Sequence, residues 1–420
     1  MLELDRFGLW LPGTGTVLDD VTWRGAAGEL WGVVGRTGSG ASSLLRAVGG
    51  SLPPGAHRCG RLRFRRGDVL HISQLPPIGV ADYLGALGVG VAEVEALGLS
   101  PYLRHRTTAV PPDIRAALLL AALRGSRPAP VVLVDAVLTA AAPRHRELFA
   151  AELRRRADHG ALVLWADHDL DTLSSVAHHI LELDHGRVAQ AVAADQWHPA
   201  TLPEPALRTL ARLLDIDVAH SHSTAAVHAR ARHAPHTARP TLRTPGPASL
   251  TIIPAEEVGL TGAPLEFGAA ESVGVINLGR RVEPDARRII ARLGGEVIGS
   301  HLPSDGRGTG DIARRRVERS TASTTPLWLP HIQAGLDPRE RHDLATRLAG
   351  ENPGVRIVTG RDVEFLVRAC RRIIVLDGDR VVTAGTPHAV AELLPDAPLV
   401  SRALATRRVL RISDLTGGAA

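Results

Sequence analysis

A glycine-rich loop near the start of the chain has the residue types and spacing for phosphate chemistry. It consists of Gly35, Arg36, Thr37, Gly38, Ser39, Gly40, Ala41, Ser42 and Ser43, and it joins the apolar run LWGVV to the amphipathic stretch SSLLRAVGG. In a strand–loop–helix setting, backbone N–H groups curl around phosphate oxygens and the helix dipole favours the negative charge. The pattern GxxxxGK[ST] is met at Gly35, Gly40 and Ser42, but alanine occupies the lysine position. A Gly/Ser turn that caps an ordinary helix has a similar sequence, so this loop by itself does not establish a nucleotide-binding site.

Three polar residues downstream of the loop belong to further motifs. Gln74 lies in HISQLPP, Asp135 ends the apolar run VVLVD, and His168 lies in ADHD, 32 positions after Ala136. With the opening segment TVLDDVTWRGAAGELWGVVG, these motifs make nearly all of residues 1–215 resemble the ATP-binding subunits of ABC transporters. The resemblance implies Mg-ATP as cofactor: the loop from Gly35 to Ser43 would hold the phosphates, Ser42 and Asp135 would bind Mg²⁺, and Gln74 and His168 would serve hydrolysis as the Q-loop glutamine and the switch histidine.

Several positions depart from the family's pattern. Ala136 stands where the resemblance places the catalytic glutamate, and Ala142 stands at the D-loop aspartate. The signature LSGGQ is expected near residues 109–113, which read AVPPD, and prolines have no N–H to offer a phosphate. Loss of the loop lysine predicts ATP binding weakened about 10- to 100-fold. Arg36 and Arg46 are nearby cations, but neither occupies the lysine position. Loss of the general base predicts hydrolysis slower by about 10²–10⁴.

The chain contains an internal repeat. Residues 166–188 align without a gap with residues 359–381 at an offset of 193, and residues 132–143 match residues 327–338 at an offset of 195. Apolar runs alternate with amphipathic stretches in both halves, which is typical of helices covering a parallel sheet. We therefore expect an α/β fold with two tandem P-loop NTPase domains of ABC type. The expected bounds are 1–219 for domain 1, 220–248 for a flexible linker rich in Arg, His and Pro, and 249–420 for domain 2.

The second half resembles the same family more weakly. Its phosphate-loop position, residues 280–288, has no glycine cradle, its Walker B pair is Pro330-His331, and Arg361 replaces the switch histidine. From Ala41 to Asp113 is 72 positions and from Ala286 to Asp311 is 25, so this half lacks about 47 residues and is truncated.

Gly308 and Gly310 lie in a segment that is either a worn signature or a polar glycine-rich loop. If the halves pair head to tail, as the resemblance implies, Gly308, Gly310 and Asp337 would complete the nucleotide site of the first half.

Composition excludes several functions. The chain has no lysine, so it has no Schiff-base lysine and no lysine general base. The net charge of +5 over 420 residues does not argue for a nucleic-acid partner. Two cysteines give no disulfide framework, and no apolar run is long enough to span a bilayer. The start of the chain does not resemble a signal peptide. We expect a cytoplasmic protein held at the inner face of the cell membrane by partner subunits.

The sequence thus predicts an ATP-binding subunit of an ABC transport system that binds Mg-ATP weakly at one asymmetric site, with slow or absent hydrolysis. Its expected partners are membrane permease subunits, with a second ATPase subunit as a further candidate. The alternative is a non-catalytic ABC pseudo-ATPase that acts as a scaffold or regulator. A third hypothesis, a soluble ABC protein acting on ribosomes or other nucleic acid, is disfavoured because the linker is short and Pro-rich.

Overall fold

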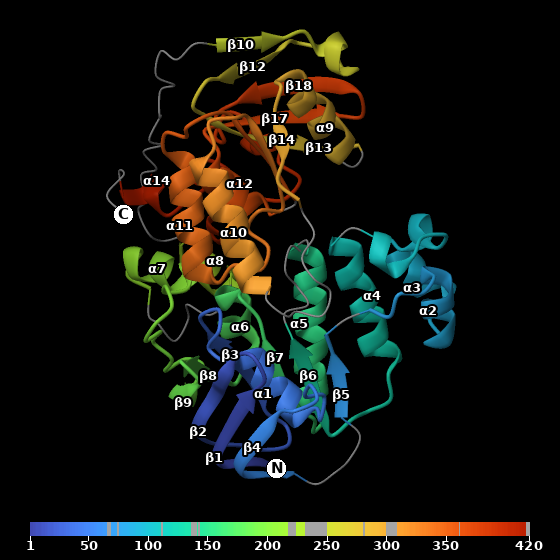
Figure 1. Cartoon of the computed structure of the whole chain (residues 1–420), viewed down its shortest axis with the longest axis vertical. Helices are drawn as coiled ribbons and strands as arrows, with labels where there is room; N and C mark the ends of the chain where they lie inside the picture. Colours follow the sequence, from blue (N-terminus) through green and yellow to red (C-terminus); the bar gives the residue numbers. More distant parts are fainter. Residues whose placement is uncertain are drawn as a thin grey trace. The chain divides into compact units, whose positions relative to one another are not determined.

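The computed structural model describes residues 1–64, 69–73, 75–110, 112–135, 141, 143–216, 224–231, 250–279, 282–299, 309–360 and 362–416. The chain divides into two compact units (Figure 1). Unit 1 comprises Met1–Pro205 and unit 2 comprises Ala206–Ala420. Each unit is described by itself below.

Unit 1 is built on a six-stranded sheet with the order β5-β6-β7-β3-β8-β9. Its first five strands run parallel, and β9 joins the edge antiparallel. A smaller antiparallel sheet has the order β2-β1-β4. The strands of unit 1 are β1 (Leu2–Leu11), β2 (Gly15–Gly25), β3 (Leu30–Gly35), β4 (His57–Phe64), β5 (Val69–Ile72), β6 (Val131–Asp135), β7 (Leu162–Ala166), β8 (His179–Asp184) and β9 (Arg187–Ala193).

Helices cover both faces of this parallel sheet. Along β6, Val131 and Leu133 pack with Leu44 of α1 in one core, while Val132 and Val134 pack with helices α4 and α5 in another. Because successive strand residues point to opposite faces, strands buried on both sides read as continuous apolar runs. The helices of unit 1 are α1 (Ala41–Val48), α2 (Val80–Ala86), α3 (Val91–Ala96), η1 (Ser100–Tyr102), η2 (Thr107–Ala109), α4 (Pro112–Gly125), α5 (Pro143–Asp158) and α6 (Leu170–Val176).

Unit 2 repeats the same topology. Its main sheet has the order β11-β18-β17-β13-β16-β15-β14, so β14, β15, β16, β13, β17 and β18 follow one another as β5, β6, β7, β3, β8 and β9 do in unit 1. The neighbours from β14 to β17 are parallel, and β18 is antiparallel to β17. The strands of unit 2 are β10 (Leu250–Ile253), β11 (Thr261–Gly262), β12 (Leu265–Gly268), β13 (Ser272–Asn277), β14 (Glu296–Val297), β15 (Leu327–Pro330), β16 (Arg356–Thr359), β17 (Arg372–Asp377) and β18 (Arg380–Gly385).

Helices also flank the sheet of unit 2. They are α7 (Ala206–Leu213), α8 (Thr224–Ala231), η4 (Ala255–Val258), α9 (Glu283–Arg292), α10 (Thr309–Ala322), α11 (Pro338–Ala349), α12 (Val363–Ala369), η5 (Ala391–Leu393), α13 (Leu399–Leu404) and α14 (Ser413–Thr416). In unit 1 the segment between β5 and α4 holds α2, α3, η1 and η2, whereas in unit 2 only residues 298–308 separate β14 from α10. The second domain is therefore truncated, as its sequence spacing predicts, and the tandem α/β fold is confirmed.

The junction of the two units differs from the predicted one. Residues 224–231, expected to lie in a flexible linker, form α8, whose buried Val227 and Ala231 pack with Val400 and Ala403 of α13. Helix α7, assigned from sequence to domain 1, contributes to this same core of unit 2. A search for apolar periodicity in the sequence misses short helices, because a single buried turn needs only two apolar residues. The remainder of the expected linker, 220–223 and 232–248, lies outside the described residues.

Candidate functional site

The glycine-rich loop connects the carboxyl end of β3 to α1. Gly38 and Gly40 have φ angles of +89° and +100°, in the left-handed region that favours glycine. A Cβ on Gly40 would lie 2.6 Å from Leu18 Cδ2 and 2.8 Å from Val17 O, so the loop rests directly on β2. Ser39 is buried, and its carbonyl accepts a hydrogen bond from the N–H of Gly186 at 3.1 Å. The loop is thus fixed by the turn between β8 and β9 as well as by β2.

The loop leaves the start of α1 without a side-chain cap. Gly40 is the N-cap residue and its carbonyl accepts from Leu44 N at 2.8 Å. The first N–H groups of a helix have no partner within it and are available to an anion. Exposure varies along the loop around them. Arg36 and Gly38 are exposed, whereas Thr37, Ala41, Ser42 and Ser43 are half-buried. The loop from Gly35 to Ser43 therefore combines left-handed glycines with an uncapped helix start, as expected of a phosphate loop, but has no lysine.

Ser42 and Asp135, the expected magnesium ligands, meet directly. The Ser42 hydroxyl donates to Asp135 Oδ1 at 2.7 Å, although the two residues are 93 positions apart in the chain. The parallel sheet brings them together, because α1 follows β3 and Asp135 ends β6 two strands away. Both side chains are half-buried. Hydroxyl and carboxylate oxygens are the ligands that Mg²⁺ prefers, and the pair fits that ion.

His71 is a titratable side chain near Asp135. It lies on β5 opposite Leu133 of β6, and its Nε2 is buried without a partner among the residues that the structure describes. Burial lowers the pKa of His71, Asp135 opposes this, and Arg46 lowers it further. The imidazole is therefore neutral at neutral pH and does not supply the charge of the missing lysine. Arg46, one helical turn after Ser42, is close enough to act electrostatically on this histidine.

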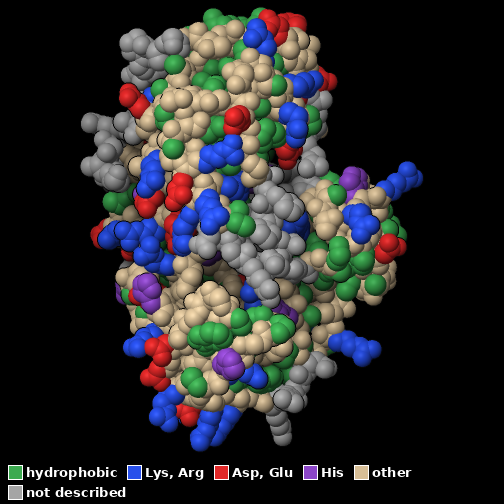
Figure 2. Space-filling view, in the orientation of Figure 1, with side chains coloured by type: hydrophobic (Ala, Val, Ile, Leu, Met, Phe, Trp, Pro, Cys, Tyr) green, Lys and Arg blue, Asp and Glu red, His purple; other side chains and the backbone are tan. Residues whose placement is uncertain are grey.

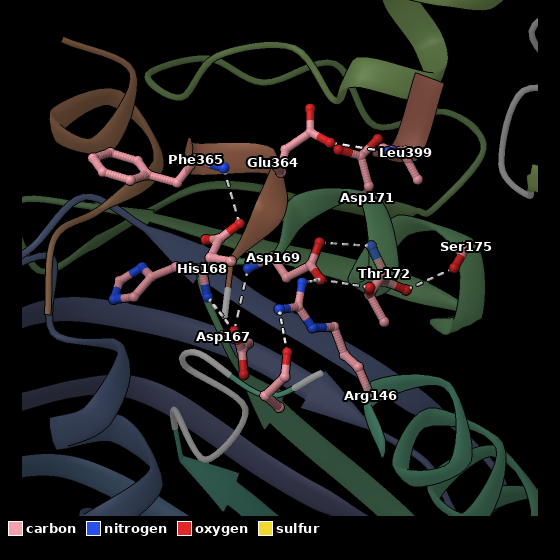
Figure 3. A network of polar contacts seen from close by, with 12 residues as sticks. Arg146, Asp167, His168, Asp169, Asp171, Thr172, Ser175, Glu364, Phe365 and Leu399 are labelled. Atoms are coloured by element: carbon pink, nitrogen blue, oxygen red, sulfur yellow. Dashed lines mark hydrogen bonds and ion pairs between the residues drawn. The ribbon is translucent and has the colours of Figure 1, made fainter. Parts of the chain in front are cut away.

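The segment around His168, the expected switch histidine, is held by a network of buried and half-buried charged side chains (Figure 3). Asp167 Oδ1 accepts the backbone N–H groups of His168 at 2.8 Å and Asp169 at 3.2 Å. Asp169 caps α6 by accepting from Thr172 N and Thr172 Oγ1, and it also receives Arg146 Nη1 of α5 at 2.5 Å. Arg146 in turn donates to the carbonyl of Ala141 at 3.0 Å. The network orders the backbone of His168, whose side chain is half-buried.

The two aspartates of this network have opposite pKa shifts. Burial and the negative charge of Asp169 raise the pKa of Asp167. Burial alone would also raise the pKa of Asp169, but the Arg146 charge and the Thr172 hydrogen bonds outweigh it and the pKa is lowered. Asp167 is 8% exposed and its Oδ2 has no partner within the described part of the chain.

Several predicted site residues lie elsewhere or outside the described residues. Gln74, Gly308, Ala136, Ala142 and Arg361 belong to the segments that are not described. Gly310 lies in the first turn of α10, in unit 2. Asp337 is the N-cap of α11, 1% exposed, and forms a reciprocal capping box with Glu340 at 2.8 and 3.0 Å. Its oxygens therefore have a structural task in unit 2.

The structure adds residues that the sequence analysis does not single out. Trp10 on β1 is 41% exposed, and its ring lies 5.5 Å from that of His57, tilted by 49°. It belongs to the hairpin whose second strand, β2, contacts Gly40. Arg146 reaches Asp169 from 23 positions away. No local spacing signals either relation.

The fit to a magnesium–phosphate group rests on three observations: a positive-φ glycine loop, an uncapped helix start and a hydroxyl–carboxylate pair at 2.7 Å. When bound, Mg-ATP would supply a phosphoanhydride for hydrolysis. The residues of the chain would hold its phosphates at the loop and its metal at Ser42 and Asp135, and would order His168 through Asp167. Among the described residues no group of three or more His, Cys, Asp or Glu side chains forms a separate metal cluster.

The chain is similar to curated ATP-binding proteins of import systems. No family model matches the chain. The chain is 31% identical over 218 residues to the hemin import ATP-binding protein HmuV of Pseudomonas entomophila (strain L48), covering 44% of this chain and 84% of the relative. It is 27% identical over 193 residues to the zinc import ATP-binding protein ZnuC of Pseudomonas syringae pv. syringae (strain B728a), covering 44% of this chain and 73% of that protein.

One of the similar solved structures covers most of this chain. The archaeal ribosome recycling factor aABCE1, in its complex with the archaeal ribosomal stalk protein aP1, has a TM-score of 0.56 at 14% identity, over 89% of this chain and 88% of its own. At that identity the likeness shows the tandem fold alone. The HmuV relative, 31% identical and covered to 84% of its length, shows the family: the chain belongs to the family of ATP-binding subunits of ABC transport systems.

Proposed function

We propose that unit 1 binds Mg-ATP weakly and hydrolyses it slowly or not at all. The observation that carries this is the direct contact of Ser42 Oγ with Asp135 Oδ1 at 2.7 Å beside a glycine loop of the required backbone form. Replacement of the loop lysine by Ala41 removes one charge-assisted hydrogen bond to phosphate, which weakens binding by about 10- to 100-fold. Arg36 is exposed on the loop and supplies only a screened charge.

Slow hydrolysis follows from the residue after Asp135. Ala136 cannot accept a proton from water, and a missing general base costs about 10²–10⁴ in rate. His71 remains near Asp135, but it lies one strand further along the sheet, at Leu133 rather than beyond the strand end. The exposed face of Trp10 is proposed as the stacking surface for the adenine base, because it lies on the hairpin that supports the loop and base stacking on an aromatic ring is sequence-independent.

We further propose that unit 1 works with a membrane permease. The segment between β5 and α4, which unit 2 lacks, carries α2 and α3, and the large apolar side chains Ile78 and Val91 there are 37% and 75% exposed. These two side chains are our candidates for contact with the permease. No helix in the described ranges is long and apolar enough to cross a bilayer. The location at the inner face of the membrane, through such a partner, belongs to the same proposal.

A second candidate function is supported by the absence of the loop lysine and the catalytic glutamate. A chain that binds nucleotide too weakly to be loaded would act as a scaffold or regulator of another ATPase or of a permease. Figure 2 shows arginine side chains interspersed with acidic ones on the face drawn there, which gives no support to a nucleic-acid partner on that face.

Equilibrium binding of ATP with Mg²⁺ to the whole chain tests the proposal. The parent is compared with the double variant Ser42→Ala, Asp135→Ala and with a control of the same residue types, Ser51→Ala, Asp82→Ala, at exposed positions of unit 1. We expect a micromolar to millimolar Kd that the first variant loses and the control keeps. If the parent does not bind at millimolar ATP, the nucleotide-binding function is refuted and the scaffold function is supported. Release of phosphate is then measured on the same proteins.

A further inference from the structure

Unit 2 contains a buried arginine that has no counter-ion among the described residues. Arg316 of α10 is 7% exposed, and its Nη2 donates to the carbonyl of Pro330 at 2.8 Å. Its Nε and Nη1 are buried and have no hydrogen-bond partner, and no ion pair reaches the guanidinium from the described residues. Burial lowers the pKa of Arg316, and no acidic group opposes that shift. Burying an unpaired cation is costly, so such a group is expected to have an anionic partner.

Two other unsatisfied side chains lie at the same edge of the sheet. His331 and Gln333 follow the end of β15, where Pro330 accepts the Arg316 bond. His331 Nδ1 is buried without a partner, and so is Oε1 of Gln333, a residue that is 4% exposed. A Cβ on Gly360 would lie 3.5 Å from His331 Nδ1 and 3.6 Å from Gln333 Nε2, so both side chains face the point where β16 ends.

The backbone at this edge is unusual as well. His331 has a φ of +46°, a left-handed conformation that costs energy in a residue with a Cβ. Pro330 and Thr359 are register partners in β15 and β16, so the two strand ends are level. Arg316 reaches this edge through the carbonyl of Pro330, and His331 and Gln333 lie beside Gly360. In open α/β sheets, ligands bind outside the carboxyl ends of the parallel strands. Backbone strain and unpartnered buried polar atoms are common features of ligand sites, and both occur at this edge.

We propose that unit 2 binds a small molecule bearing an oxyanion at the carboxyl ends of β15 and β16, with Arg316 as its positively charged anchor and His331 and Gln333 as hydrogen-bonding partners. Arg316 offers the N–H groups of Nε and Nη1 to the oxyanion. The amide of Gln333 pairs with a neighbouring hydroxyl of the ligand, so the class is a hydroxylated phosphate or carboxylate. The other ring nitrogen of His331, Nε2, lies 4.0 Å from Glu283 Oε1, which leaves Nδ1 to face the ligand.

A nucleoside triphosphate does not fit this place. The segment from Arg281 to Arg288 has no glycine, and the first turn of α9 carries Glu283 and Asp285. Acidic residues at a helix start occupy the positive end of its dipole and repel a phosphate chain. The proposed ligand therefore sits on the Nδ1 side of His331, at the ends of β15 and β16, and the proposal is independent of ATP binding by unit 1.

The test measures anion binding by calorimetry on the whole chain carrying Ser42→Ala, Asp135→Ala, so that the loop of unit 1 is impaired. The probes are inorganic phosphate, glycerol phosphate and malate at constant ionic strength, with chloride as the reference. In this background Arg316→Met is compared with Arg315→Met, the same change at an exposed position of α10. We expect Arg316→Met to raise the Kd of the bound probe by about 10- to 100-fold, and Arg315→Met to leave it within twofold. Glycerol phosphate and malate distinguish the phosphate from the carboxylate class.

Two outcomes overturn the proposal. One is that no probe binds; the other is that a probe binds equally well to Arg316→Met. If Arg316→Met does not fold, Gln333→Leu provides the second test, because it removes a hydrogen-bonding partner and leaves the charge. We expect Gln333→Leu to raise the Kd about fivefold or more and to reduce the rise in Tm that the anion produces. An unchanged Kd and Tm shift in that variant would assign the cluster a structural role only.

Discussion

Replacing Arg146 by methionine removes the cation that holds the switch-histidine segment. In the parent chain, Arg146 Nη1 lies 2.5 Å from Asp169 Oδ2, and the two side chains are 22% and 16% exposed. Methionine fills much of the same volume without the charge. Asp169 then remains mostly buried, with only the Thr172 donors, beside the carboxyl group of Asp167. We expect unit 1 to lose stability and the backbone of His168 to lose its fixed position.

The magnitude follows from the partners that remain. Breaking a buried ion pair by removing one side costs roughly 3–5 kcal/mol, because the other charge stays uncompensated. Here the pair is partly exposed and Thr172 still donates two hydrogen bonds, so the expected loss is about 2–4 kcal/mol in the free energy of unfolding. The second change Asp169→Asn removes the stranded charge. In the double variant we expect a coupling energy of about 1–3 kcal/mol relative to the sum of the single changes.

Urea unfolding followed by tryptophan fluorescence measures these differences, since Trp165 is fully buried in β7 directly before the network. The control is Arg154→Met on the same helix, whose ion pair with Asp158 is 43% and 54% exposed and is expected to contribute less than about 1 kcal/mol. Two results would refute the reasoning that this charge pair orders the segment. One is that Arg146→Met loses no more free energy of unfolding than the control. The other is that the loss in the double variant equals the sum of the losses in the two single variants.

Three further predictions concern the site of unit 1. Ala41→Lys restores the phosphate-loop cation and should lower the Kd for Mg-ATP about 10- to 100-fold, measured by equilibrium binding; an unchanged Kd would mean that the loop does not contact phosphate. Trp10→Ala removes the proposed base platform and should raise the same Kd about 5- to 100-fold while leaving the Kd for inorganic triphosphate unchanged, so equal effects on both ligands would contradict stacking. Asp167→Asn should change the pH dependence of stability. A raised pKa in the folded state gives stability that is present below the ordinary aspartate pKa and lost as pH rises through the folded value. The variant should therefore gain on the parent by about 1.4 kcal/mol per pH unit across that interval, and parallel stability curves in urea titrations at several pH values would contradict this.

Much of the fold is determined by patterns within short windows of the sequence. The apolar runs ending at Gly35 and Asp135 predict strands buried on both faces, and the structure has β3 and β6 there. The repeat at offsets 193 and 195 predicts two domains of one topology, and the sheets of units 1 and 2 have the same strand order. These features are local or periodic, so they can be predicted from the residue types alone. The missing segment of unit 2 follows from spacing for the same reason.

Tertiary structure alone decided which side chains meet. The contact of Ser42 with Asp135 was expected from a resemblance, whereas the Arg146–Asp169 pair joins residues 23 positions apart without any motif. Nothing in the sequence distinguishes Arg316 from the other arginines of α10, because only packing shows that its guanidinium is buried without a counter-ion. Likewise, helix α8 is stabilised because two of its residues are buried against α13, which lies far away in the sequence. Burial and pairing depend on contacts between distant segments, and the free energy of a polar group is set by those contacts.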